Sequence, residues 1–184
     1  LAGFAIAAAL GLALGLLNAR SRVSTRVSYL LLEAVRVTPP LSLIPLLILW
    51  LGIDEAPKIA IVFLASFFPI YMNATNLAQA VDPKLEEAAK LLRFTKSERL
   101  HYLTLPSSLP GILTGLRLGF GYSWRALVTA ELIAASSGLG FLISDSAEFA
   151  KTDTVFVGII TIAVVGVIAD LSLIHISEPT RLAL

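Results

Sequence analysis

Long apolar stretches make up most of this chain, and short polar or charged segments separate them. Because roughly 20 consecutive apolar residues cross a bilayer core as a helix, each long stretch predicts a membrane span. We expect about five spans, at Leu1–Ala19, Val35–Ile53, Lys58–Ala80, Gly111–Ala135 and Val155–Asp170. A composition with 57% hydrophobic and 15% charged residues is typical of a membrane protein rather than a soluble domain. The pattern therefore predicts an all-α, polytopic membrane helical bundle.

Small residues and prolines distinguish the first two spans from plain hydrophobic helices. Gly11 and Gly15 form a small-xxx-small pair, which lets a neighbouring helix approach closely. Val27–Val37 predicts a helix at the membrane surface that leads into the second span. Prolines interrupt that span at Pro39, Pro40 and Pro45. A broken helix can line a transport pathway or be a simple kink, and the residues leave both interpretations open.

Basic residues indicate which side of the membrane each segment faces. Arg20, Arg22 and Arg26 directly follow the first span, and an excess of such residues is typical of cytoplasmic loops. The segment Asp82–Pro110 is also basic, and two predicted spans separate it from the first cluster, so both face the cytoplasm. On the opposite side, Leu139–Ala150 predicts a short amphipathic helix.

The segment Asp82–Pro110 predicts two short helices joined by a turn. Asp82 is a suitable N-cap for a helix from Pro83 to Leu92, because its carboxylate can accept the first free backbone N–H groups. A second helix, Lys96–Tyr102, follows a break at Arg93–Thr95, and two Leu-Pro pairs then lead into the next apolar run. A two-helix hook between membrane spans suggests a docking element.

The residue order within the hook resembles the EAA loop of ABC-importer permeases. That motif has an acidic residue and two alanines, a position that is usually glycine, and an aliphatic residue shortly before Leu-Pro. The matching residues are Glu87, Ala88, Ala89, Arg93, Leu103, Leu105 and Pro106. Arg93 departs from the motif, and because the glycine at a helix end is usually left-handed, we expect about 1 kcal/mol of backbone strain there. Three stretches in and around the hook are similar to the nitrate/sulfonate/taurine branch of the family, namely residues 67–85, 109–124 and 130–159.

The resemblance implies a type I ABC-importer permease domain over residues 1–170, with residues 82–106 as a cytoplasmic coupling loop that inserts into an ATP-binding subunit. Ala88 and Ala89 would form a small face for close approach, and Glu87 would offer a carboxylate to the partner. The resemblance also implies a second, identical permease copy, an external solute-binding protein and the bacterial inner membrane. The chain has no Gly-x-x-x-x-Gly-Lys loop, so we expect ATP on the partner, no cofactor here and no enzyme activity of its own.

Ionisable residues within the span Gly111–Ala135 are candidates for a polar interior or a pathway. Arg117 lies near the cytoplasmic end, where its long side chain can reach the membrane surface. Arg125 and Glu131 lie deeper, where charges are costly. At about 100° per residue these two do not share a face, so we expect partners on other helices, whereas Glu131 shares its face with Trp124 and loosely with Arg117. Solute contact, a structural role beside Glu131 and a lipid headgroup all stay open for Arg125.

Charge and composition argue against several other function classes. A net charge of +1 gives no support for a nucleic-acid partner, and a chain with no cysteine and only two histidines offers no usual metal-ligand set. A passive channel or structural membrane protein would explain the spans but not the spaced hook. A lipid-modifying membrane enzyme would need clustered acids, histidines or metal ligands at one membrane face, and no histidine lies near Asp145, Glu148 and Asp153 in the sequence. The branch resemblance points to a small anion such as nitrate, taurine or another sulfonate as the solute.

The family pattern also bears on the two ends of the sequence. Because Leu1 lies within an apolar run, we expect one further span before it. Residues 171–184 depart from the pattern and resemble a translated sequencing adapter. We therefore expect this tail to be non-native and His175 to have no functional role.

Overall fold

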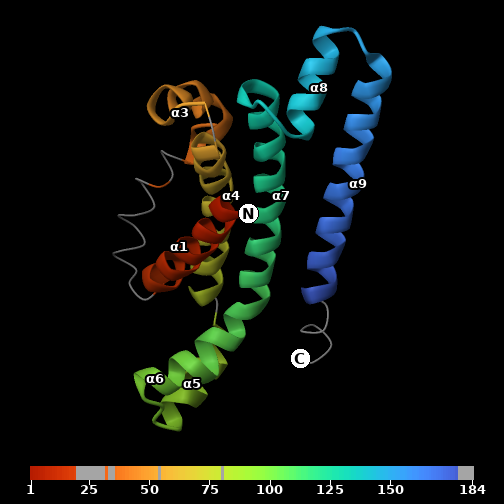
Figure 1. Ribbon diagram of the computed structural model, residues 1–184. Coiled ribbons are helices and arrows are strands. Elements are labelled where there is room, and N and C mark those ends of the chain that lie inside the picture. Colours follow the sequence, from red (N-terminus) through yellow and green to blue (C-terminus); the bar gives the residue numbers. More distant parts are fainter. Residues whose placement is uncertain (20–31, 33–35, 54, 80, 178–184) are drawn as a thin grey trace.

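The computed structural model describes residues 1–19, 32, 36–53, 55–79 and 81–177, and most of the expected surface helix Val27–Val37 lies outside them. Every regular element in the described residues is helical, and the long helices form an elongated bundle (Figure 1). The predicted all-α helical bundle is confirmed.

Helix α4 (Glu55–Gln79) lies at the centre of the bundle, between α1 (Ala2–Ala19) and α7 (Leu105–Ala134) (Figure 1). Small residues of both neighbours make this packing close. They are Gly3, Ala7, Gly11 and Gly15 of α1 and Gly115 and Gly119 of α7. A Cβ atom at Gly15 would lie only 2.7 Å from the Cβ of Ala74, so no larger residue fits there without a shift. The close packing predicted from the small-xxx-small pair is confirmed.

Three helical segments are long and apolar enough to cross a membrane, while two other apolar helices are shorter. The long segments are Glu55–Asn76, Lys96–Glu148, which includes α7, and Thr152–Leu173, and the shorter helices are Ala2–Asn18 and Pro40–Leu51. Within the expected span Val35–Ile53 the helix is broken, as its prolines suggested, because Thr38 forms a bend and Pro39 is extended. Arg36 and Val37 are helical before the break, and η1 (Pro40–Leu43) and α3 (Ile44–Leu51) follow it. Consecutive prolines cannot continue a helix, and the remainder is too short for a core of about 30 Å.

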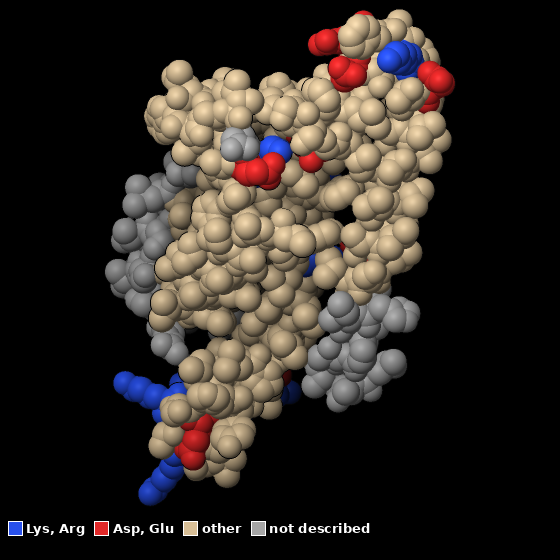
Figure 2. Space-filling view, viewed as in Figure 1, with Lys and Arg blue, Asp and Glu red and all other residues tan. Residues whose placement is uncertain are grey.

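The elements at the two ends of the bundle differ in kind. One end carries the hook helices α5 (Pro83–Leu91), α6 (Lys96–Arg99) and the π-helical turn η2 (Leu100–Thr104) (Figure 1). The other end carries α3 and the expected short helix α8 (Leu139–Glu148), which leads into α9 (Thr152–Ser177). Charged atoms gather at both ends, with a largely uncharged band between them (Figure 2). This distribution fits a protein whose middle lies in lipid.

Helix α9 extends beyond the predicted end of the domain. It continues without a break from Asp170 to Ser177, although a change of character was expected at residue 171. The non-native origin of residues 171–184 stays a prediction, because a continuous helix does not test it.

Candidate functional site: the hook and the polar face of α7

The first arm of the hook, which we define as Asp82–Thr104, begins with the predicted cap. The Asp82 carboxylate accepts the backbone N–H of Lys84 at 2.9 Å, and Pro83 is the first helical residue of α5. This side chain takes the place of an intrahelical partner that the first turn lacks. The start of the hook is therefore fixed by local sequence.

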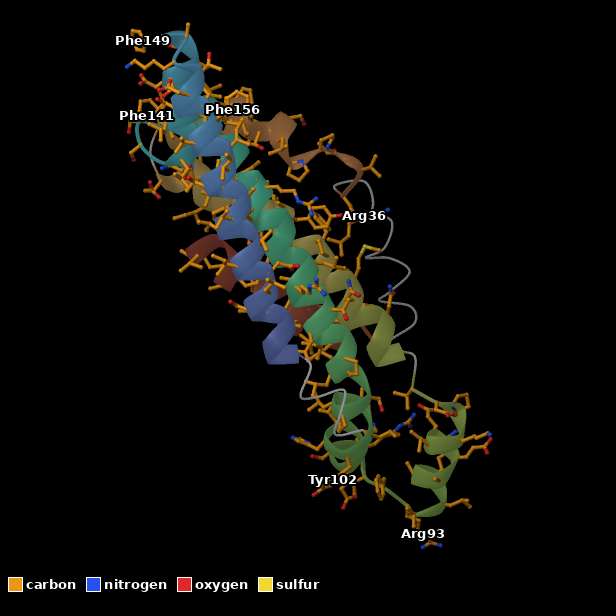
Figure 3. All side chains as sticks on the ribbon, turned by 90° about the vertical axis from the view of Figure 1, so that its right-hand side faces the viewer. Arg36, Arg93, Tyr102, Phe141, Phe149 and Phe156 are labelled. Atoms are coloured by element: carbon orange, nitrogen blue, oxygen red, sulfur yellow. The ribbon has the colours of Figure 1, made fainter. Side chains whose placement is uncertain are left out.

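The arm ends at Arg93 in a left-handed conformation. Its φ is 56°, its N–H donates to Lys90 O at 3.1 Å, and the N–H of Phe94 donates to Ala89 O at 2.9 Å. These two bonds define a Schellman motif, in which the left-handed residue is usually glycine. The expected backbone conformation is confirmed, and Arg93 lies at the tip of the hook (Figure 3).

The second arm is continuous with α7, whereas the sequence predicted a separate apolar run from Gly111. Thr95 and Glu98 form a capping box at the start of α6. The arm then widens into η2, where the N–H of Leu105 donates to Leu100 O, and passes directly into α7. Pro106 causes no break because it lies in the first turn of α7, next to the wide π turn.

Contacts between the two arms hold the hook together. Arg99 of the second arm makes an ion pair with Glu86 of the first. Ala89 and Leu103, one from each arm, are only 5% and 7% exposed. The two alanines of the motif therefore do not form one outward face as expected, because Ala89 points into the hook while Ala88 is exposed.

The outer surface of the hook is unusually apolar for a charged segment. Among the motif residues, Glu87 and Arg93 are exposed on the hook, while at the start of α7 Pro106 is exposed and Leu105 is half-buried. Leu85, Ala88 and Leu92 recur at helical spacing on one side of α5, and the two leucines are 49% and 69% exposed. We call these three residues the outer stripe. Tyr102 adds a further exposed ring on the second arm (Figure 3).

The predicted polar face of α7 contacts α8 and α9. Arg117 was expected to reach the membrane surface; instead its Nε and Nη2 donate to the two carboxylate oxygens of Asp170 on α9 at 3.0 and 2.9 Å. Trp124 lies against Gly166, where an added Cβ would be 2.9 Å from the indole Nε1. These residues and Glu131 point to the same side of α7, as the sequence predicted.

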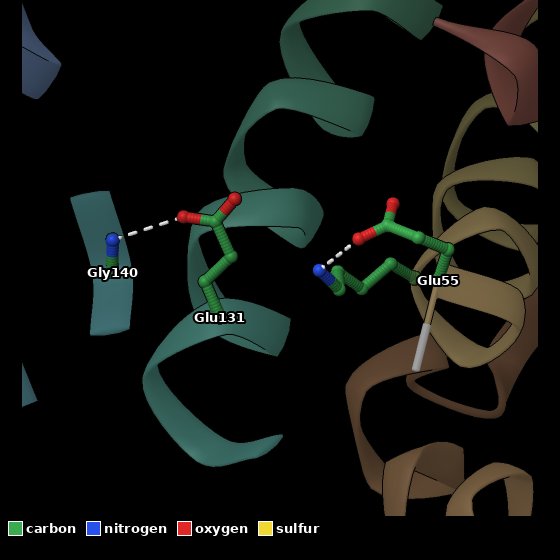
Figure 4. Close-up of polar contacts among 4 residues, drawn as sticks. Glu55, Glu131 and Gly140 are labelled. Carbon is green, nitrogen blue, oxygen red and sulfur yellow. Dashed lines mark hydrogen bonds and ion pairs between the residues drawn. The ribbon is translucent and has the colours of Figure 1, made fainter. Parts of the chain in front are cut away.

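Glu131 contacts the backbone of α8. Its Oε2 accepts the N–H of Gly140 at 3.0 Å (Figure 4). The same end of the bundle holds a second polar contact, in which Lys58 donates to Glu55 in the first turn of α4. The expected partner of Glu131 on another helix is thus confirmed, and it is a backbone group.

Arg125 lies on a different side of α7. Its guanidinium carbon is 5.2 Å from the centre of the Tyr122 ring, one turn earlier on the same helix, and both side chains are exposed. Among the described residues, no ion pair joins Arg125 to Glu131. This side of α7 carries a charge and has no neighbour within the described chain.

Three contacts of the site were not predicted from the sequence. Asp170 is 53 residues from Arg117 along the chain, and Gly140 is nine residues from Glu131 on the next helix, and no local signal pairs them. The Thr95–Glu98 capping box could have been found, since Thr-x-x-Glu before a helix is a local signature. In the described residues, no three acids or histidines lie together as a metal site.

Comparison with known proteins finds a matching family and several similar permeases. A family model described as binding-protein-dependent transport system inner membrane component matches residues 7–180. The chain is 43% identical over 168 residues to the putative aliphatic sulfonates transport permease protein SsuC of Bacillus subtilis (strain 168), covering 91% of this chain and 61% of that protein. It is 42% identical over 143 residues to the taurine transport system permease protein TauC of Escherichia coli (strain K12), covering 78% and 52%.

A third relative extends the range of named solutes. The nitrate import permease protein NrtB of Synechocystis sp. (strain ATCC 27184 / PCC 6803 / Kazusa) is 32% identical over 168 residues, covering 91% of this chain and 61% of that protein. The chain thus spans between 52% and 61% of the length of these three relatives. The match to the family model covers nearly all of this chain, and the chain belongs to the family of binding-protein-dependent transport system inner membrane components.

Proposed function

We propose that this chain is the permease subunit of an ATP-driven importer for a small anion, and that the hook binds the ATP-binding subunit. The observation that carries this proposal is the outer stripe, exposed on a charged hook whose second arm is continuous with α7. An exposed apolar patch with a polar rim is typical of a protein interface. Because helix α7 extends from the hook into the membrane, movement of the hook changes the position of a span.

The charge of the hook favours a protein partner over lipid as the cover of the stripe. Leu85 and Leu92 alternate with Lys84, Lys90 and Arg93, which are exposed and suit an aqueous cytoplasmic surface. Glu87 is exposed beside the stripe and can pair with a basic group of the partner. ATP would be bound and hydrolysed by that partner, so this chain carries no cofactor and is not itself the enzyme.

The side of α7 with Tyr122 and Arg125, which is exposed in the described part of the chain, is our candidate for the solute pathway. A guanidinium within a membrane helix is costly in lipid, so the side with Arg125 and Tyr122 faces water or protein. A second copy of the chain placed against this side would enclose a pathway with a positive group in it. The relatives are named for aliphatic sulfonates, taurine and nitrate, and a guanidinium suits such anionic groups.

The remaining partners follow from the same proposal. The family description names binding-protein-dependent transport and the inner membrane. We infer an external solute-binding protein at the end that carries α3 and α8, and a multi-pass location in the bacterial inner membrane. The hook then lies in the cytoplasm, on the side that the basic residues indicate.

Capture of the ATP-binding subunit tests the proposal. The full-length permease is co-expressed with the ATP-binding subunit encoded beside it, and the complex is purified from detergent extracts. We expect Leu85→Glu with Leu92→Glu to abolish capture, and Glu87→Ala to weaken it. Phe149→Glu is the matched control, because it places an acid on an equally exposed side chain at the opposite end (Figure 3). Ala89 is left unchanged, because its substitution would disrupt the hook itself.

The results separate the proposal from its alternative. Loss of capture in the stripe variant alone, with normal membrane insertion, supports an importer subunit. A wild-type protein that is folded and inserted but captures no ATP-binding subunit would favour a passive channel or structural membrane protein. Equal capture by the stripe variant and the wild type would place the interface elsewhere.

A further inference from the structure

We infer that Glu131 is a positioning residue, which couples α7 to the α8–α9 hairpin so that movement of the hook reaches the opposite end of the bundle. The effect on transport rests on the proposed function, whereas the link between α7 and α8 rests on the contacts of Glu131. The carboxylate holds the start of α8 through the N–H of Gly140 (Figure 4).

The start of α8 lacks a cap from its own sequence. Its N-cap residue is Gly138, which has no side chain to accept the first N–H groups. Glu131, from the last turn of α7, supplies the missing acceptor and places a negative charge at the positive end of α8. A cap supplied by another helix fixes two helices to each other, which a local cap cannot do.

Two glycines leave room for this carboxylate. A Cβ atom at Gly138 would lie 2.5 Å from both Cδ and Oε2 of Glu131. At Gly140 it would lie 2.6 Å from the Cβ of Glu131 and 2.6 Å from Val128 O. Gly138 also has a φ of 121°, which other residues rarely adopt. Only glycine therefore fits at the two positions beside the carboxylate, and the sequence provides glycine at both.

The position of Glu131 along α7 gives the contact its consequence. Helix α7 has 30 residues and is about 45 Å long, with the hook at one end and Glu131 at the other. No loop interrupts the path between them, because η2 passes directly into α7. When the hook moves, Glu131 moves with α7 and carries the start of α8 with it.

Coupling efficiency in the assembled transporter tests the inference. The full-length permease with its ATP-binding subunit and binding protein is placed in liposomes, and ATP hydrolysis and solute uptake are measured together. In Glu131→Ala we expect hydrolysis to continue, because the hook is intact, and uptake per ATP to fall at least about five-fold. Glu131→Gln should lie between, since its amide oxygen can still accept the N–H of Gly140. Thr161→Val, in the middle of α9, should match the wild type, because the Thr161 hydroxyl donates to Val157 O of its own helix.

A second measurement separates coupling from folding. Spin labels are attached at Ile133→Cys on α7 and Leu142→Cys on α8, both exposed, and any cysteine in the rest of the full-length permease is replaced by serine, since these 184 residues contain none. In the wild type we expect one narrow distance that is the same with and without trapped nucleotide. Glu131→Ala should broaden that distance.

The outcomes distinguish this inference from the proposed function. If the wild type shows no ATP-driven uptake, the proposed function fails, while the spin-label distance still decides whether Glu131 holds α8. If the wild type transports and Glu131→Ala keeps full uptake per ATP, the inference is overturned. It is equally overturned if hydrolysis, uptake and protein yield fall in parallel, because Glu131 then serves the fold alone.

Discussion

At the residue scale, two helix ends of this protein close in the same way. Arg93 and Ala150 have φ values of 56° and 52° at the ends of α5 and α8. In each case the next N–H, that of Phe94 or Lys151, donates to the carbonyl five residues earlier at 2.9 Å. Glycine adopts this conformation at the least cost. The backbone therefore favours glycine at both positions, and only a side-chain contact can favour arginine.

We expect Arg93→Gly to stabilise the hook by about 1 kcal/mol, because glycine removes the steric cost of the left-handed conformation. The measurement is hydrogen exchange at the N–H of Phe94 in the detergent-solubilised protein, which should become slower. Ala150→Gly is the matched control, with slower exchange at Lys151 and no change in the hook. Faster exchange at Phe94 would contradict the prediction, and a clear loss of ATPase capture would assign Arg93 a partner contact.

The capping box makes the hook sensitive to acid. The backbone N–H of Thr95, and then its hydroxyl, donate to the Glu98 carboxylate and lower the pKa of that carboxyl below its ordinary 4.5. Because the folded pKa is depressed, the contact contributes stability that is fully present above pH 4.5. That stability is lost as the pH falls through the lower folded pKa.

We expect Thr95→Ala, which removes only the hydroxyl, to raise the pKa of Glu98 part of the way toward its ordinary value. Thr95→Pro also removes the N–H at a residue whose φ of −64° suits proline, and it should raise the pKa further. Carboxyl NMR titration of glutamate-labelled protein gives both values. An equal rise in the two variants would mean that the hydroxyl is the main donor.

At the element scale, the glycines of α7 differ in what they face. A Cβ at Gly115 would lie 2.8 Å from the Cβ of Asn73 on α4, a rigid neighbour. At Gly121 the nearest atom is Nη2 of Arg125, at an ordinary 3.8 Å. The first glycine is required by close helix packing, and the second is not.

We expect Gly115→Ala to destabilise the bundle by about 1–3 kcal/mol, because the added methyl group forces α4 and α7 apart. Gly121→Ala should be neutral or stabilise by up to about 1 kcal/mol, because alanine is the better helix former. Unfolding of both variants in the same detergent gives the two free-energy changes. A similar change in both would mean that the separation of α4 and α7 adapts freely.

Elements formed by interactions between residues close in the sequence could be predicted, and those that depend on distant residues could not. The caps at Asp82 and Arg93 could be predicted because they act on backbone groups a few residues away. The inward position of Ala89 could not, since it depends on how the second arm folds back. The break within the expected span Val35–Ile53 could also be predicted, because Pro39 and Pro40 are local signals that interrupt a helix.

At the scale of the whole molecule, α7 organises the chain through three different sides. One side packs on α4 through glycines, one contacts α8 and α9, and one, with Arg125, has no neighbour in the described residues. Periodicity alone placed Arg117, Trp124 and Glu131 on a common side. It could not say what that side contacts, because helix neighbours are set by the tertiary fold and, for the third side, by other subunits.

The Arg117–Asp170 pair gives the last prediction, which concerns how α9 is held. Below α8, helix α9 contacts α7 through Gly166 and this two-point pair, and its other side is exposed and apolar. We expect Asp170→Asn to weaken the bundle, because it leaves the guanidinium of Arg117 within the span without its carboxylate. The double variant Arg117→Leu with Asp170→Leu should lose less stability than the single variants Arg117→Leu and Asp170→Leu lose when added together. The reason is that removing both charges leaves neither one unpaired. A double-mutant cycle from unfolding in detergent measures the difference, and strictly additive losses would mean that packing against Trp124, rather than the ion pair, holds α9.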